Sequence, residues 1–358
     1  MTRRLPPVRR LVVKVGSAAL IGPDGEVSAR RLAKVVRDVS DAARGRGCVL
    51  VSSGAIATGL TPLGLARRPR DMPTLQAAAA VGQGRLVAGY ARLFARRGLV
   101  VAQVLLTQDD FVRRRHYVNA RNTLERLLKA GAIPVVNEND TIGTEEIRFG
   151  DNDRLAALTA VMLGADLLVL LSDVDGIYTK DPGRKGAALL EEVADLSAIE
   201  AGATRSGLGS GGMASKVEAA RIATAAGVGV VVAGAARRDV VARVLAGEPE
   251  GTWLPPSGGK RPSRKAWLAF VSGLRGRIVV DAGAERAVRE AGRSLLAAGV
   301  TGVEGDFEAG DTVEVAGPGG TVFARGVTNH NSRELPALAG TRGGESPVIH
   351  RDELVLLD

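Results

Sequence analysis

Short apolar runs alternate with longer segments of helical periodicity through residue 245 of the chain. The runs are rich in Val and Leu and lack regular polar alternation, which is typical of strands covered by helices on both faces. They are LVVKVG (11–16), CVLVSSGA (48–55), VVAQVLLT (100–107), IPVVNEND (133–140), DLLVLLSDVDG (166–176) and VGVVVAGA (228–235). The segments between them predict helices over residues 28–44, 75–97, 119–131, 153–165 and 213–227. The sequence therefore predicts an α/β domain with a mostly parallel sheet sandwiched by helices.

The pattern changes after residue 246. Residues 247–274 combine proline, glycine and basic residues without a clear period, so we interpret them as a connector. Beyond them a short helix is followed by strands with Gly-rich turns, most clearly in TVEVAGPGGTVFARG (312–326). We therefore expect an α/β domain over residues 1–246 and a small β-rich domain over residues 275–358.

Composition excludes several kinds of site. The chain has 358 residues, for which two domains are the expected number. Aromatic residues make up only 3% of it, which argues against a site built on stacked bases. The lone cysteine, Cys48, excludes an internal disulfide and a zinc–cysteine cluster, and its apolar surroundings predict a buried thiol. We expect a reducing, cytoplasmic setting.

The start of the chain imitates a secretory signal, with basic residues before an apolar run. Lys14 interrupts that run, so we interpret it as the first strand of the sheet. Nowhere do about 18 apolar residues follow one another, and we expect no membrane-spanning segment.

The formal net charge of +9 is distributed unevenly. Residues 275–358 hold nine Arg against thirteen Asp and Glu, a net charge of −4, so residues 1–274 carry the remaining +13. The basic larger part favours small anionic substrates. The acidic C-terminal part lacks the electrostatic attraction that RNA binding needs, so we expect no RNA partner and assign it a structural or regulatory role.

Candidate chemistry lies where the apolar runs end, because ligands of α/β sheets bind beyond the carboxyl ends of the strands. Lys14 lies inside the first strand, and a doubly covered strand has no favourable place for an ammonium group unless that group faces an anion. Ser52 and Ser53 precede Gly54 and a helix start, where backbone N–H groups form an anion cradle or an ordinary helix cap.

Two clusters of Asn and acidic residues follow further along the chain. The first, residues 137–140, ends a strand, and the second, residues 151–153, precedes a helix, where capping is an alternative explanation. Together they indicate a pocket for a ligand with both an ammonium and a carboxylate group. Ser172, Asp173 and Asp175 end another strand, where they bind a sugar hydroxyl or a metal, or form a turn.

The stretch GLGSGGMASK (207–216) has the glycines of a phosphate-binding loop. It lacks the Gly-Lys-Ser/Thr ending and the preceding strand of a Walker P-loop. A helix continues directly from it and puts Lys216 in its first turns, so a bare linker is also excluded.

Taken in order and spacing, the motifs KVGS, SSGAIATG, PVVNEND, GDND, LLSDVDGIYTKDP and GLGSGGMASK closely resemble those of the glutamate 5-kinases, a group of the amino acid kinase family. The C-terminal part resembles a PUA domain. This resemblance implies transfer of the γ-phosphoryl group of ATP, with Mg²⁺, to the side-chain carboxylate of L-glutamate, as the first step toward proline.

The resemblance also implies roles for particular residues. Lys14 and Lys216 would be the catalytic lysines on opposite sides of the phosphoryl group, and Asp153 would hold both in position. Ser53, Asp140 and Asn152 would bind glutamate. The ATP-binding residues would be Lys14, Ser172, Asp173, Ser210, Gly211, Gly212, Met213, Ala214, Ser215 and Lys216. Mg²⁺ would be held mainly through the ATP phosphates, and no protein metal ligand is assigned.

The family resemblance implies a homo-oligomer and proline as a feedback inhibitor. One alternative is a kinase for another acidic compound, such as N-acetylglutamate or aspartate. A second alternative is an RNA-binding protein that acts through the PUA-like domain. Glutamate-dependent ATP turnover distinguishes the expected kinase from both.

Overall fold

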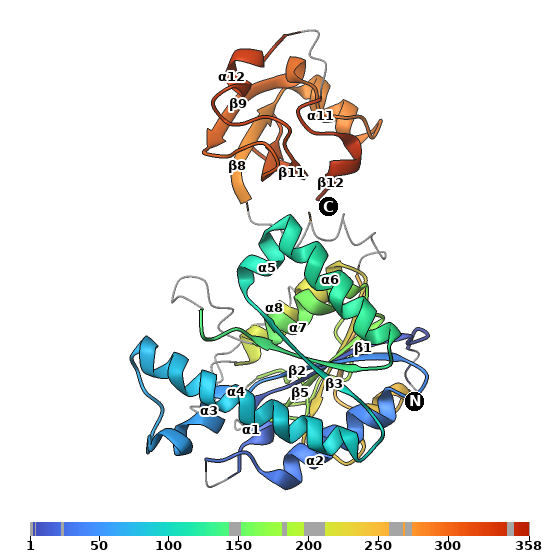
Figure 1. The fold of residues 1–358 in the computed structure, drawn as a ribbon. Coiled ribbons are helices and arrows are strands. Elements are labelled where there is room, and N and C mark those ends of the chain that lie inside the picture. The colour runs from blue at the N-terminus through green and yellow to red at the C-terminus, as the bar shows by residue number, and fades with distance from the viewer. Residues whose placement is uncertain are drawn as a thin grey trace. The chain divides into compact units, whose positions relative to one another are not determined.

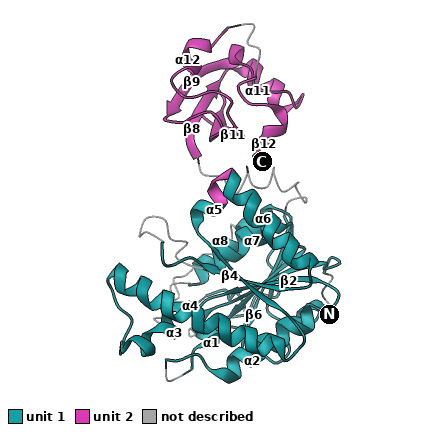
Figure 2. Ribbon diagram, viewed as in Figure 1, with its two compact units in different colours: residues 1–110, 115–260 teal, residues 111–114, 261–358 magenta. Residues whose placement is uncertain are grey.

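The structure, a computed structural model, describes residues 3, 5–22, 25–142, 152–180, 185–196, 212–257, 268, 274–341 and 347–357. It has two compact units, which Figure 2 shows in different colours. The first unit comprises residues 1–110 and 115–260, and the second comprises residues 111–114 and 261–358.

The first unit contains a seven-stranded sheet in the order β3-β4-β2-β1-β5-β6-β7. Its strands are β1 (Arg10–Val15), β2 (Gly47–Ser52), β3 (Val101–Leu106), β4 (Ile133–Glu138), β5 (Leu167–Ser172), β6 (Gly229–Gly234) and β7 (Thr252–Leu254). All neighbouring pairs are parallel except the last, in which β7 runs antiparallel to β6. The predicted parallel sheet is therefore confirmed, with β1 at its centre.

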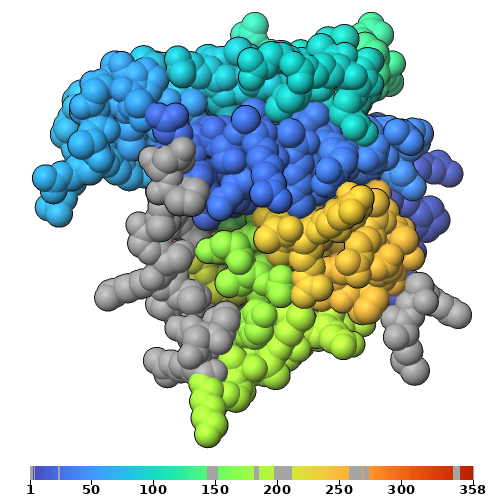
Figure 3. Space-filling model, turned by 90° about the horizontal axis from the view of Figure 1, so that it is seen from below, coloured from blue at the N-terminus to red at the C-terminus, as the bar shows by residue number. Residues whose placement is uncertain are grey.

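Helices cover both faces of this sheet. Figure 1 shows α6, α7 and α8 on one side and α2 and α4 on the other. The helices are α1 (Ser17–Leu20), α2 (Ala29–Ala42), α3 (Ala55–Leu60), α4 (Met72–Ala95), α5 (Gln108–Val112), α6 (Arg114–Lys129), α7 (Asn152–Leu163), α8 (Met213–Ala225) and α9 (Val240–Leu245). The space-filling view of Figure 3 shows α2, in blue, lying between the α4 and α9 segments, and α2 contacts both helices. All five helices predicted from the pattern are confirmed.

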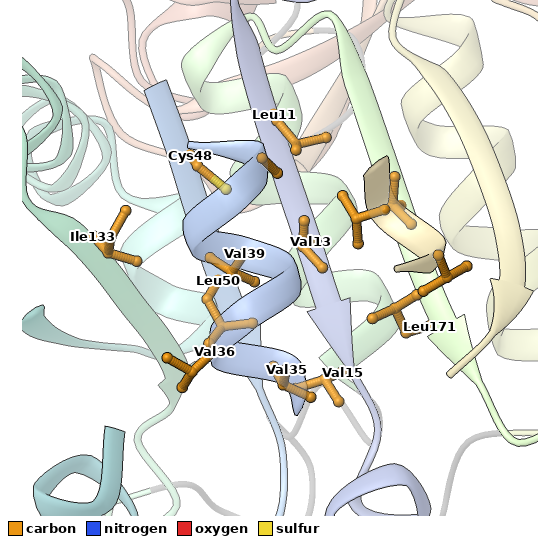
Figure 4. Packing of buried hydrophobic residues seen from close by; sticks show 14 of the residues in the cluster. Leu11, Val13, Val15, Val35, Val36, Val39, Cys48, Leu50, Ile133 and Leu171 are labelled. Carbon is orange, nitrogen blue, oxygen red and sulfur yellow. The ribbon is translucent and has the colours of Figure 1, made fainter. Parts of the chain in front are cut away.

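Successive residues of β1 face opposite sides of the sheet, and this alternation places the site. Leu11, Val13 and Val15 belong to the apolar core that β1 shares with Val35 and Val39 of α2, as Figure 4 shows. The residues between them, including Lys14, face the α7 side. Cys48, also in this core, is 1% exposed, so the predicted buried thiol is confirmed.

The connector expected over residues 247–274 is wrong in its first part. Residues Thr252–Leu254 form β7 and belong to the sheet. The ring of Trp253 lies where a side chain on Gly229 would be, so the glycine makes room for this edge strand. A three-residue strand is too short to show a periodicity, which is why the pattern did not reveal it.

The second unit contains a five-stranded sheet in the order β12-β11-β10-β8-β9 around its own apolar core. Its elements are β8 (Leu274–Val280), α11 (Ala282–Arg289), β9 (Val300–Gly305), β10 (Thr312–Ala316), β11 (Val322–Val327), α12 (Leu335–Leu338) and β12 (Leu354–Leu356). Strands β10 and β11 form an antiparallel hairpin, and Gly320 in its turn has a φ of 77°. The β-rich domain expected in this region is thus confirmed. Within the described residues of both units, no helix is long and apolar enough to cross a membrane.

Candidate active site

Lys14 is the penultimate residue of the central strand, and its side chain is almost fully buried. On the neighbouring strands β2 and β5, its partners in register are Val51 and Leu170. Lys14 is 3% exposed, and its Nζ lies 2.5 Å from Oδ1 of Asp153. A buried ammonium group needs such a partner, because burial without one costs several kcal/mol.

Asp153 is the second residue of α7 and holds a second lysine as well. Its other oxygen, Oδ2, lies 3.1 Å from Nζ of Lys216. Asp153 is fully buried and Lys216 is 6% exposed, so the attraction is little screened by solvent. The two lysines and the carboxylate carry a formal charge of +1 together, and the N-terminal end of α7 adds to it. This arrangement favours an anion.

The start of α8 brings Lys216 to this cluster. Gly212 is the N-cap residue of α8, and Lys216 lies in the first turn, as the sequence predicts. Ser215 Oγ lies 3.1 Å from Asp153 Oδ2 and 2.8 Å from the carbonyl oxygen of Gly212. Two further residues assigned to the phosphates, Met213 and Ala214, begin the helix, whereas Ser210 and Gly211 lie outside the described residues.

A second polar cluster adjoins the first, because Asn152 directly precedes Asp153. The Nδ2 of Asn152 lies 2.9 Å from Ser53 Oγ, 3.1 Å from the carbonyl oxygen of Ser52 and 2.9 Å from Asn137 Oδ1. The ends of β2 and β4 and the start of α7 therefore meet at one amide group. Two of the residues assigned to the amino acid substrate, Ser53 and Asn152, are in direct contact.

The remaining predicted residues lie at the same edge of the sheet. Asp140 is two residues beyond β4 and half-buried. Ser172 ends β5, is 4% exposed, and its hydroxyl donates to Oδ1 of the exposed Asp173 at 3.0 Å. Arg237 pairs with Asp175 at 3.0 Å and, by its hydrogen bond, holds the pKa of that carboxyl below its usual value. Asp175 is therefore already engaged on the surface.

Sequence reasoning missed two residues of α4 that contact this region. Gln83 accepts a hydrogen bond from Asn137, and Tyr90 pairs with Ser52. Both lie inside a long predicted helix, where a polar residue ordinarily faces solvent. The one sequence signal of their burial was their spacing of seven residues. This spacing places both side chains on one face of the helix, and that face also carries the apolar residues.

Comparison with known proteins gives the class first. A family profile described as the amino acid kinase family matches residues 9–234, and one described as the PUA domain matches residues 276–347. Together with the layered sheet and the buried lysine–aspartate–lysine cluster, the first match defines a kinase unit of that family.

Curated relatives of nearly the same length define the group within this class. The glutamate 5-kinase of Salinispora arenicola is 51% identical over 100% of both chains. That of Streptomyces coelicolor is 53% identical and covers 98% of this chain and 96% of its own, and that of Myxococcus xanthus is 46% identical, covering 99% and 97%. The chain belongs to the glutamate 5-kinases of the amino acid kinase family.

Proposed function

We propose that the protein transfers the γ-phosphoryl group of ATP to the side-chain carboxylate of L-glutamate, giving L-glutamyl 5-phosphate, the first step of proline biosynthesis. The observation that carries this proposal is the adjacency of Asn152 and Asp153 at the start of α7. Asn152 belongs to a polar cluster suited to an amino acid, and Asp153 holds two lysines suited to a phosphoryl group. The glutamate 5-kinase relatives, 46–53% identical, support the choice of substrate.

The chemistry of the phosphoryl acceptor, the side-chain carboxylate of glutamate, determines what the protein must contribute to catalysis. A side-chain carboxylate is ionised near neutral pH, so it attacks without a general base. Two anions must nevertheless approach in line, and the loose transition state spreads charge over the transferred oxygens. The site therefore has to align the reactants and compensate negative charge.

Lys14 and Lys216 perform the compensation in this proposal. Their ammonium groups come from a strand and from a helix start, and Asp153 fixes both, so little reorganisation accompanies the reaction. Lys14 also contacts the phosphates of ATP. Asp153 is a positioning residue, because both of its oxygens are engaged by the lysines.

The residues present fit ATP. Gly212–Lys216 supply backbone N–H groups at the N-terminal end of a thirteen-residue helix, which favours phosphate oxygens. Ser172 ends β5, the strand next to β1, and Asp173 directly follows it. Both would contact the nucleotide, and Ser210 and Gly211 would extend the phosphate contacts. Bound ATP supplies the phosphoryl group and the phosphates that hold Mg²⁺. Within the described residues, no group of three or more His, Cys, Asp or Glu side chains suits a metal ion.

Glutamate is assigned to the second cluster. Ser53 and Asn152 offer polar groups to its α-carboxylate and ammonium, and Asp140 pairs with the ammonium. The side-chain carboxylate would then extend toward the lysines, since residues 152 and 153 are consecutive. A substrate without a free ammonium group would lose this contact with Asp140.

The test is an assay of the purified protein with MgATP and three acceptors: L-glutamate, N-acetylglutamate and L-aspartate. Release of ADP reports turnover, and hydroxylamine traps an acyl phosphate as a hydroxamate. We expect both signals with glutamate at rates far above those with the other two. Activity confined to N-acetylglutamate would assign the protein to a different substrate.

Two partner assignments also belong to this proposal. Proline would act as an inhibitor that competes near the glutamate site, and the protein would form a homo-oligomer. A proline titration of the same assay tests the first, and light scattering during gel filtration tests the second. Inhibition independent of glutamate concentration, or a monomeric mass, would contradict them.

A further inference from the structure

Helix α4 contacts the ends of two strands through buried polar side chains. Gln83 is 8% exposed, and its Oε1 accepts a hydrogen bond from Asn137 Nδ2 at 2.7 Å. Tyr90, seven residues later on the same face, is fully buried, and its hydroxyl lies 2.8 Å from Ser52 Oγ. Burial of such groups is costly unless each has a partner, so these contacts fix α4 against the edge of the sheet that carries the site.

The amide groups of Gln83, Asn137 and Asn152 form a chain with a fixed direction. The backbone N–H of Glu138 donates to Asn137 Oδ1 at 2.9 Å, so this oxygen cannot exchange places with Nδ2. Asn137 Nδ2 must therefore face an acceptor, which is Gln83 Oε1. At the other end, Asn152 Nδ2 faces both Asn137 Oδ1 and the carbonyl oxygen of Ser52. Two backbone groups thus determine which atom of each amide is the oxygen and which is the nitrogen, while the Gln83 contact holds the Asn137 amide in place.

With the amides oriented in this way, one acceptor atom of Asn152 has no donor among the described residues. Asn152 Oδ1 is buried and has no hydrogen-bond partner within the described part of the chain. Flipping the amide would not satisfy it, because Oδ1 would then face the carbonyl oxygen of Ser52. The missing partner is a donor, and the α-ammonium of an amino acid is a donor.

Two glycines, Gly59 of α3 and Gly82 of α4, allow these helices to approach closely, and this contact fixes the position of Gln83 in α4. A side chain on Gly82 would lie 1.8 Å from the carbonyl oxygen of Ala55, and one on Gly59 would lie 1.8 Å from that of Ala78. Helices α3 and α4 are therefore in direct backbone contact. Because α3 begins two residues after Ser53, this contact fixes Gln83 relative to the substrate loop.

We propose that Gln83 is a positioning residue for the amino acid substrate: by holding the Asn137 amide, it keeps Asn152 Oδ1 directed at the substrate ammonium. The inference rests on the proposed function, since it assigns the ammonium to glutamate. Gln83 itself touches neither substrate, so its loss affects binding of glutamate more than the chemical step.

The experiment measures steady-state kinetics of Gln83→Met in the full-length chain. Methionine matches glutamine in length but has no amide acceptor, so Asn137 Nδ2 is left without its partner. We expect the KM for glutamate to rise about tenfold, with kcat within about threefold and the KM for ATP within about twofold of the parent. Gln83→Asn, which shortens the side chain by one methylene and withdraws its oxygen from Asn137, should give the same pattern.

Two control variants separate positioning from a general loosening of α4. Tyr90→Phe removes one hydroxyl from the same helix face. That hydroxyl contacts the Ser52 side chain and none of the three amides, so both KM values should stay within about twofold. Leu86→Ala opens a cavity at a residue that is 2% exposed and should lower the Tm without a selective change in the glutamate KM.

The outcomes distinguish failure of the proposed function from failure of the inference about Gln83. A parent without glutamate-dependent turnover would reject the proposed function and this inference together. An active parent with an unchanged glutamate KM in both Gln83 variants would reject the inference alone. Parallel rises in both KM values, the same selective rise in Tyr90→Phe, or failure of both Gln83 variants to fold would make Gln83 a structural residue and likewise overturn it.

Discussion

Asp153 joins parts of the kinase unit that are about two hundred residues apart in the sequence. Lys14 reaches it from the first strand and Lys216 from the last long helix. Burial of either ammonium group without a partner would be unfavourable. Together with one carboxylate, the two lysines form a compact, preorganised charge centre. The catalytic proposal depends on this single carboxylate.

Asp153→Asn should therefore affect both activity and stability. The two ammonium groups lose their shared partner, so we expect kcat to fall at least about 100-fold and the Tm without ligand to fall as well. ATP, which would supply negative charge, should raise the Tm of the variant more than that of the parent. Thermal unfolding with and without MgATP measures this difference.

Asp175→Asn is the matched control for that experiment. Asp175 pairs with Arg237 at 3.0 Å, but both side chains are more than two-fifths exposed, so the loss should be below about 1 kcal/mol. An equal effect of ATP on the Tm of Asp153→Asn and of the parent would contradict the role given to Asp153.

At this scale the sequence predicted types of residue better than their contacts. Lys14 stood out because an ammonium in an apolar strand needs an anion, and Asp153 because it begins a helix. The contact between Gln83 and Asn137 joins residues more than fifty positions apart, and no local pattern records it. The orientation of an amide depends on neighbours that only the fold brings together.

At the scale of elements, the close contact of α3 and α4 gives a direct test of the packing around the site. Gly82→Ala would place a methyl group against the carbonyl oxygen of Ala55, so the helices must separate, at a cost of about 3 kcal/mol. Gly84→Ala, two residues along the same helix, meets nothing within 4 Å and should stabilise the protein by about 0.4–1 kcal/mol. Urea unfolding of both variants measures the difference. Equal effects would show that the helices are not in backbone contact.

Asp110, in the first turn of α5, predicts a pH dependence of stability. Burial raises the pKa of Asp110, but hydrogen bonds from the Thr107 backbone N–H at 2.7 Å, the Thr107 hydroxyl at 2.8 Å and His116 at 2.9 Å outweigh it, so the pKa lies below its usual value. A depressed folded-state pKa stabilises above the unfolded value of about 4 and loses this contribution as the pH falls.

Asp110→Asn should therefore lower the free energy of unfolding at pH 7 and have a smaller effect near pH 3. Urea titrations of parent and variant across that range measure the difference between them. A difference that stays constant with pH would contradict a depressed pKa for Asp110.

Element prediction succeeded where period and length were clear. All five predicted helices and the long strands are present, because apolar runs and helical spacing determine which faces are buried. Strand β7 was missed because three residues show no period, and the proline, glycine and basic residues of the same segment are typical of a connector. Most of the alanines of helix α8 are buried, because a small side chain allows close packing on several sides.

At the scale of the whole molecule, the two units have separate apolar cores. Every residue of the first core precedes residue 254, and every residue of the second lies between 278 and 354. A chain ending at residue 257 should therefore fold and retain glutamate-dependent turnover within about threefold of the full chain. Loss of turnover in a folded truncated chain would mean that the second unit contributes to the kinase site.

The most direct test of the account is glutamate-dependent hydroxamate formation by Lys216→Ala beside the parent. Lys216 is held by Asp153 in the cluster proposed to compensate the transferred charge, so we predict a fall in kcat of about 10² to 10³ with the fold retained. Lys129→Ala, at the exposed end of α6, should leave the rate unchanged. A Lys216→Ala rate within about twofold of the parent would contradict the central claim that this cluster carries phosphoryl transfer.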